Sequence, residues 1–167
     1  MVFQYNHKTL ALITDHIPVK DIPQLIDSSV IITKIEMCLK SFPEIKDVYI
    51  AGINPHGGEQ GLLGSEDQCI EDAVKELQKL YPEIMFSGPL AGDSFFIDPE
   101  DNKLYVSMFH DQGLSAFKAK YRYYGSHLTL GLPFKRFSVD HGTAFNLFGE
   151  NKADYMGCLL VLKQILK

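Results

Sequence analysis

The chain has 167 residues, of which 46% are hydrophobic and 22% charged, and its formal net charge is −5. This length suffices for one compact domain with a core, or for two small lobes. The mildly acidic balance and the scattered lysines give no electrostatic reason to expect nucleic acid or a membrane surface as a partner. No apolar run approaches the roughly 20 residues that cross a bilayer.

The cysteines and the first residues carry little functional signal. Cys38, Cys69 and Cys158 lie far apart and lack metal-type spacing, which favours a reduced, cytoplasmic setting. The first six residues lack the basic start and apolar stretch of a secretory signal. We expect a frayed terminus around His7 and assign that residue no role.

Strand-like and helix-like stretches alternate along the chain. Residues 10–13 predict a strand, and a helix follows that Ser28 or Ser29 can cap and that Pro43 ends. The predicted apolar face of this helix has steps of three and four residues and consists of Ile31, Ile35, Cys38, Leu39 and Phe42. Residues 48–53 predict the next strand.

The second predicted helix has the clearest periodicity and ends before Pro82. Its apolar residues at helical spacing are Ile70, Ala73, Val74, Leu77 and Leu80. Acidic side chains load its first turns with the charge that the helix dipole favours, namely Glu66, Asp67, Glu71 and Asp72.

The remaining predicted elements continue the alternation. Strands are predicted at residues 84–86, 104–109, 128–130 and 137–139, and a closing helix at 153–166. Alternating strands and helices predict an α/β protein, with a three-layer arrangement in which helices cover both faces of a sheet.

Three of the predicted strands lead to a histidine: His16, His56 and His110. If these strands are neighbours in one parallel sheet, their carboxyl ends meet at the edge where open α/β sheets place ligands. Three neutral imidazoles can hold a metal ion and leave positions open for substrate or water, as in catalytic sites. A single histidine at a strand end is more often a capping or hydrogen-bonding residue, but three together favour a metal.

Four segments give the chain a more specific character: residues 54–59 (NPHGGE), 110–114 (HDQGL), 129–134 (TLGLPF) and 138–144 (SVDHGTA). Together they resemble the 4-hydroxythreonine-4-phosphate dehydrogenase family of pyridoxal phosphate biosynthesis. The resemblance runs from about residue 10 to the C-terminus and matches only the C-terminal half of the family's usual length. It implies an isocitrate/isopropylmalate dehydrogenase-like fold in which residues 1–167 form parts of two lobes meeting near 111–125, with the N-terminal half absent.

The resemblance implies a metal centre shared between two copies of the chain. His16, His56 and His110 fall on the family's three ligands for a divalent metal, which are assembled across a homodimer interface. Zinc suits three imidazoles, while magnesium, manganese or cobalt can add oxygen ligands from substrate and water. Asp15 and Asp111 flank two of these histidines and can either orient the imidazoles or cap helices.

The resemblance also implies a phosphorylated small-molecule substrate. Lys118 and Arg136 fall on substrate-binding positions, with Lys118 the expected catalytic residue, and their cationic donors suit a phosphate or carboxylate. His127 stands where the family has Asn; imidazole can still donate a hydrogen bond, but it is bulkier and titrates near neutrality. Taken singly, the two cations are ordinary surface charges.

NAD is the implied cofactor, since no side chain accepts a hydride. The chain has no G-x-G-x-x-G after a strand. The segment from Asp140 to Asp154 instead resembles the nucleotide-binding loop of isocitrate and isopropylmalate dehydrogenases. The expected cofactor-binding residues are Asp140, His141, Gly142, Thr143 and Ala144. Asp140 and His141 can either contact the cofactor or form a structural hydrogen-bonded pair beside it.

The implied reaction is the NAD- and metal-dependent oxidation and decarboxylation of 4-phosphooxy-L-threonine in pyridoxal 5'-phosphate biosynthesis. One alternative is a dehydrogenase of a four-carbon sugar-acid phosphate, such as threonate or erythronate 4-phosphate. Another is a non-catalytic metal-binding or dimerising module. We expect the 167 residues alone to bind a divalent ion and to turn over poorly.

Overall fold

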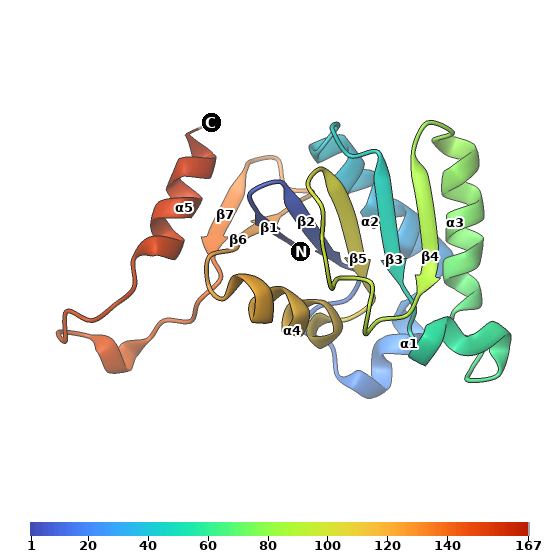
Figure 1. The fold of residues 1–167 in the computed structure, drawn as a ribbon, viewed down its shortest axis with the longest axis horizontal. Helices are drawn as coiled ribbons and strands as arrows, with labels where there is room; N and C mark the ends of the chain where they lie inside the picture. Colours follow the sequence, from blue (N-terminus) through green and yellow to red (C-terminus); the bar gives the residue numbers. More distant parts are fainter. Residues whose placement is uncertain (167) are drawn as a thin grey trace.

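Seven strands form one mixed sheet in the computed structural model, which describes residues 1–166 (Figure 1). The strands are β1 (Val2–Tyr5), β2 (Lys8–Leu12), β3 (Asp47–Ala51), β4 (Met85–Leu90), β5 (Lys103–Ser107), β6 (Ser126–Thr129) and β7 (Arg136–Val139). Their order across the sheet is β4-β3-β5-β2-β1-β6-β7. The first four of that order pair in parallel, and the remaining pairs are antiparallel.

The strands that lead to the three histidines are neighbours, which is the condition on which the predicted site at their carboxyl ends depends. β5 lies between β3 and β2, and both pairings are parallel. The ladder between β2 and β5 extends to Leu12 opposite Ser107, and that between β3 and β5 to Ile50 opposite Val106. The carboxyl ends of all three strands therefore lie at one edge of the sheet.

Helices cover both faces of the sheet, which confirms the predicted layers. The helical elements are α1 (Ile22–Leu25), α2 (Ser28–Ser41), α3 (Gln68–Leu80), α4 (His110–Tyr121) and α5 (Met156–Ile165), with short turns η1 (Val19–Asp21), η2 (Pro55–Gly61) and η3 (Phe145–Leu147). α2 and α3 pack on one face of the sheet over a shared buried cluster, and α4 packs on the other face over a second cluster (Figure 1). No helix within the described residues is long and apolar enough to cross a bilayer.

The apolar face predicted for α2 is the one that packs on the sheet, and all five of its residues are buried. The cap differs from the prediction. Asp27, rather than Ser28 or Ser29, precedes the first turn, and its carboxylate accepts a hydrogen bond from the backbone N–H of Val30 at 2.8 Å. A carboxylate at this position satisfies a free N–H and suits the positive end of the helix.

The expectation of a frayed N-terminus is wrong. β1 lies inside the sheet, where β2 pairs with one of its edges and β6 with the other. Val2 and Phe3 are buried, one on each side of the sheet. Four residues are too few to show a strand period in the sequence, and only pairing with distant segments stabilises this strand.

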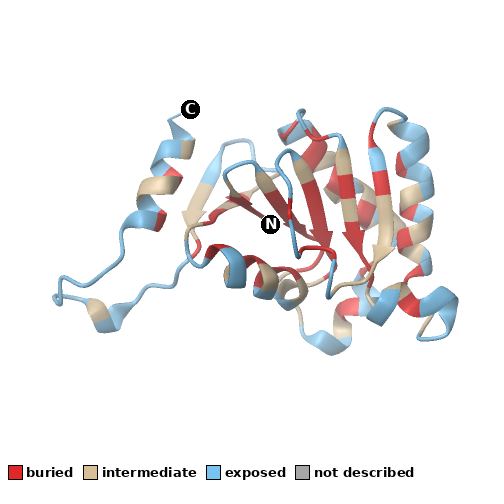
Figure 2. Ribbon diagram, viewed as in Figure 1, coloured by how far each residue is buried: buried red, intermediate tan, exposed pale blue. Residues whose placement is uncertain are grey.

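Buried residues concentrate along β2, β3 and β5, whereas the segment after β7 is almost entirely exposed (Figure 2). Phe145 and Phe148 in this segment keep 82% and 92% of their surface exposed. The seven strands form one continuous sheet, and the division into two lobes near residues 111–125 stays a prediction. Much of that interval is the helix α4, which the sequence reading did not predict.

Candidate active site

The ends of β2 and β5 bring His16 and His110 together. Beyond the ladder, the backbone N–H of Thr14 donates to the carbonyl of Met108 at 3.0 Å, and the Thr14 hydroxyl donates to the same oxygen at 2.7 Å. His16 lies two residues after Thr14, and His110 lies two residues after Met108. Their ring centroids lie 5.5 Å apart with an interplanar angle of 42°. Two imidazoles therefore face the carboxyl edge of the sheet side by side.

The aspartates beside these histidines have different roles. Asp111 places a carboxylate oxygen 2.7 Å from Nδ1 of His110. This contact fixes the ring and leaves Nε2 as the atom that can bind a ligand, as with histidines that hold metals. Asp15 instead accepts a hydrogen bond from the backbone N–H of His16 at 2.9 Å. Asp111 therefore orients an imidazole, while Asp15 orients main chain.

His56 lies in the turn η2, where the backbone is left-handed. Six consecutive residues, 56–61, have positive φ angles, which glycine adopts easily and other residues rarely. Three of the six are glycines, and a Cβ atom at Gly57 would lie 2.8 Å from the carbonyl oxygen of Pro89. His56 is exposed and lines a cavity of about 300 Å³ together with Asn54, Asp93 and Gln112.

Within one chain, His56 does not join the other two histidines. Among residues 1–166, no three His, Cys, Asp or Glu side chains gather closely enough to hold a metal ion. The pair His16 and His110, with one ring held by a carboxylate, is a donor set that fits a divalent transition metal if a third ligand comes from elsewhere. Assignment of all three histidines to one shared ion stays a prediction.

Lys118 is joined to the predicted cofactor segment. Its Nζ atom lies 3.0 Å from Oδ1 of Asp140 and donates to the Asp140 carbonyl at 3.4 Å. Asp140 is buried, and burial raises the pKa of its carboxyl, while the Lys118 ammonium and the charge of His110 oppose the rise. Oδ2 of Asp140 is buried without a hydrogen-bond partner among the described residues. One ion pair thus connects a predicted substrate-binding residue with a predicted cofactor-binding one.

His127 is held tightly on β6. Its Nδ1 lies 3.0 Å from the hydroxyl of Ser138, its partner in the ladder with β7, and its ring stacks on Phe3 at a centroid distance of 5.0 Å. Nε2 is buried without a partner within residues 1–166. Burial lowers the pKa of His127, and the N-terminal amine and Arg136 lower it further. The imidazole is therefore neutral at neutral pH.

Arg136 and the remaining predicted cofactor-binding residues are exposed. The Arg136 guanidinium donates to the hydroxyl of Thr129 at 2.7 Å across the β6–β7 pair. His141 places Nδ1 2.9 Å from the carbonyl of Gly142, while Asp140 is paired with a lysine, so the two cofactor residues take different partners. A largely apolar cavity of about 460 Å³ lies here, and its lining includes Tyr124, His141, Gly142, Ala144 and Asp154.

The sequence assigned no role in the site to two polar residues near the histidines, Asp67 and Gln112. The Asp67 carboxylate is buried and accepts hydrogen bonds from the backbone N–H groups of Ile53 and Asn54 at 2.6 and 3.2 Å, so it binds the histidine loop instead of the helix end. Gln112 bonds to the ends of β3 and β5. Its only sequence signal is its place in the HDQG segment.

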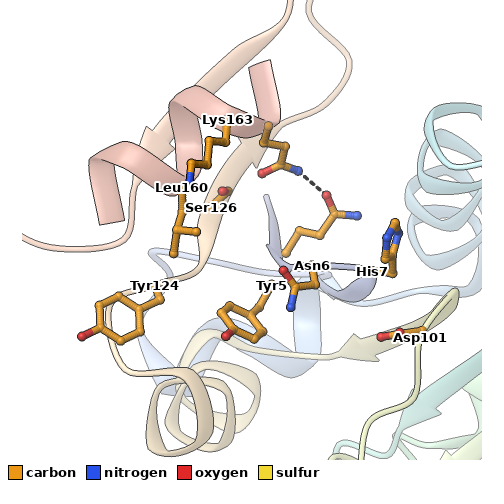
Figure 3. Close-up of a pocket in the computed structure, with 10 residues that line it drawn as sticks. Tyr5, Asn6, His7, Asp101, Tyr124, Ser126, Leu160 and Lys163 are labelled. Atoms are coloured by element: carbon orange, nitrogen blue, oxygen red, sulfur yellow. Dashed lines mark hydrogen bonds between the residues drawn. The ribbon is translucent and has the colours of Figure 1, made fainter. Parts of the chain in front are cut away.

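A further cavity, of about 350 Å³, lies near the turn between β1 and β2, at the end of β2 opposite to the one that leads to His16 (Figure 3). The turn between β1 and β2 supplies Tyr5, Asn6 and His7, while α5 supplies Leu160 and Lys163. A hydrogen bond from Gln164 to Gln4 connects the helix to the sheet. The predicted site residues lie elsewhere, so this cavity is separate from the candidate active site.

Comparison with known proteins decides the family. Residues 1–163 match the family described as pyridoxal phosphate biosynthetic protein PdxA. The chain belongs to this family. It is 38% identical over 173 residues to the 4-hydroxythreonine-4-phosphate dehydrogenase of Aquifex aeolicus, a match covering 98% of this chain and 52% of the relative. It is 40% identical over 160 residues to the enzyme of the same name from Sulfurihydrogenibium, covering 92% and 49%.

Solved structures agree with this assignment. The chain superposes on a 4-hydroxythreonine-4-phosphate dehydrogenase from Klebsiella pneumoniae with a TM-score of 0.80 and 26% identity, covering 97% of this chain and 51% of that one. A Burkholderia phymatum structure of the same name gives 0.74 and 31%, with coverages of 98% and 52%. The fold is of the isopropylmalate dehydrogenase type. The chain spans about half the length of the curated relatives that it matches.

Proposed function

We propose that this protein acts in the NAD-dependent, divalent-metal-dependent oxidation and decarboxylation of 4-phosphooxy-L-threonine in the cytoplasmic biosynthesis of pyridoxal 5'-phosphate. The single observation that carries the proposal is the pairing of His16 and His110 at the carboxyl edge of the sheet.

In this proposal the residues of the chain bind and orient the reactants. The substrate alcohol loses a hydride to the nicotinamide and a proton, and the resulting β-keto acid then loses CO2 and takes up a proton. A bound divalent ion would polarise the alcohol oxygen and stabilise negative charge as CO2 leaves. His16 and His110 would hold that ion, and Asp111 keeps the second ring in place.

Lys118 and Arg136 supply the positive charge for the phosphate and carboxylate of the substrate. Arg136 presents an exposed guanidinium whose fork suits two phosphate oxygens. The Lys118 ammonium is partly exposed and forms an ion pair with Asp140. It can therefore donate a proton from Nζ to a substrate oxygen while the Asp140 carboxylate stabilises the position of the ammonium.

A second candidate substrate, a four-carbon sugar-acid phosphate, is favoured by His127. The ring stands at the family's Asn position, is neutral and is held by Ser138 and Phe3, so it offers a different surface from an amide. Turnover of 4-phosphooxy-L-threonine should be compared with that of threonate and erythronate 4-phosphate. Faster turnover of either hydroxy acid would overturn the first proposal.

A third candidate is a metal-binding module without turnover. It is favoured by the predicted cofactor segment. A Cβ atom at Gly142 would meet no atom within 4 Å, and the side chains of Phe145 and Phe148 are exposed. The purified chain should be titrated with Zn²⁺ or Co²⁺ and assayed for NAD reduction. We expect ion binding, its loss in His110→Ala and its retention in His7→Ala, with little NAD reduction. Robust reduction would exclude the module, and no ion binding by the unaltered chain would overturn the metal site.

A further inference from the structure

The Gln112 side chain connects the ends of two strands. Its Oε1 accepts a hydrogen bond from the backbone N–H of Met108 at 2.7 Å, and its Nε2 donates to the carbonyl of Gly52 at 2.7 Å. Met108 directly follows β5 and Gly52 directly follows β3. The backbone ladder between these strands ends at Ile50 and Val106. One amide therefore provides the next link beyond the ladder, with both of its polar ends used.

The residue that follows β5, Met108, is also bonded to the segment that follows β2. The backbone N–H of Met108 donates to Gln112, and the carbonyl of Met108 accepts two hydrogen bonds from Thr14. His16 and His110 follow two residues after Thr14 and Met108. Because each histidine is so close in sequence to a bound residue, a shift of Met108 would change the separation of the two rings.

The Gly52 end of the link leads to the third histidine. The N–H of Gly52 donates to the carbonyl of Leu90 at 2.7 Å, and Asp67 binds the next two backbone N–H groups. The residues between Gly52 and His56 are therefore held from several directions. Gly92 leaves the room that the Gln112 amide needs, since a Cβ atom at residue 92 would lie 2.8 Å from its Nε2 atom.

We propose that Gln112 is a positioning residue that sets the spacing between the His16 and His110 pair and the loop that carries His56. This inference rests on the proposed function, because it concerns how the chain holds a divalent ion. Gln112 touches neither the ion nor the substrate in this role. It acts by fixing the strand ends that carry the imidazoles, and residues that orient metal ligands typically change metal affinity about 10- to 100-fold.

The test is Co²⁺ binding by the purified chain, measured as affinity and as the visible absorption spectrum of the bound ion. Gln112→Met keeps the length of the side chain and removes both hydrogen bonds. We expect about a 10- to 100-fold weaker affinity and an altered spectrum. Gln68→Met is the matched control, because the Gln68 amide bonds only to exposed carboxylates on α3; it should bind Co²⁺ as the unaltered chain does.

Gly92→Ala places a methyl group against the Gln112 amide without changing Gln112 itself. This variant tests the positioning role if Gln112→Met does not fold. It should displace the amide and weaken Co²⁺ binding in the same direction. Unchanged affinity and spectrum in the folded variants, with Co²⁺ bound by the unaltered chain, would overturn the positioning role. Failure of the unaltered chain to bind Co²⁺ would instead overturn the metal site of the proposed function.

Discussion

At the scale of single residues, His127 shows how a side chain is changed by its surroundings. The sequence identifies it only as a histidine at a position where the family has Asn. In the structure the ring is stacked on Phe3, bonded to Ser138 and half-buried, with Nε2 unpartnered among the described residues. Burial disfavours the charged ring, so its neutral form is part of the folded state.

This neutral histidine should make stability depend on pH. Burial lowers its pKa below the usual 6.5, so the unfolded chain binds the proton more tightly than the folded one. The free energy of unfolding should therefore decrease as the pH falls through about 6.5, with a limit near 1.4 kcal/mol per pH unit for one proton. Urea denaturation between about pH 5 and pH 7.5 measures this slope.

His127→Asn should reduce that slope, since Asn does not titrate in this range. His7→Asn is the matched control, because His7 is an exposed histidine in the turn between β1 and β2. A slope that is the same in His127→Asn and in the unaltered chain would show that burial of this ring does not affect stability.

At the scale of elements, the turn η2 depends on backbone freedom and on close approach. Gly57 has a φ of +64°, and its Cα lies so near β4 that a Cβ atom would lie 2.8 Å from the carbonyl oxygen of Pro89. The backbone oxygen cannot move as a flexible side chain can. The glycine pair of the NPHGGE segment therefore allows the left-handed turn.

Gly57→Ala should lower the free energy of unfolding by about 1–3 kcal/mol, because alanine resists a positive φ and clashes with main chain. Gly142→Ala is the control. A Cβ at residue 142 meets no atom within 4 Å, so we expect a change of less than about 0.5 kcal/mol. Equal stabilities of the two variants in urea denaturation would contradict the left-handed turn.

At the scale of the whole molecule, the distribution of the histidines bears on assembly. Within residues 1–166, His16 and His110 lie together and His56 is exposed and apart, so the proposed site with all three histidines would need a second copy. A two-fold arrangement would give each of two sites a pair from one chain and a single histidine from the other. This agrees with the homodimer that the family resemblance implies.

Such sharing predicts complementation between inactive variants. His56→Ala and His110→Ala chains, each without a complete site, should regain high-affinity Co²⁺ binding when co-expressed, in about a quarter of the sites for a statistical mixture. Co-expressed His16→Ala and His110→Ala should regain none, because both residues belong to the same half of a site. Recovery in neither mixture would contradict the shared metal centre.

The sequence alone determined most of the main elements and the family. Hydrophobic periodicity and strand-end motifs are local patterns, so they can be recognised in the sequence without knowledge of the packing. Only the tertiary structure decided that β1 lies inside the sheet, that two of the three histidines meet within one chain, and that Gln112 and Asp67 bind the strand ends. These features depend on distances between segments far apart in the chain, which pairing and packing set and which no local pattern encodes.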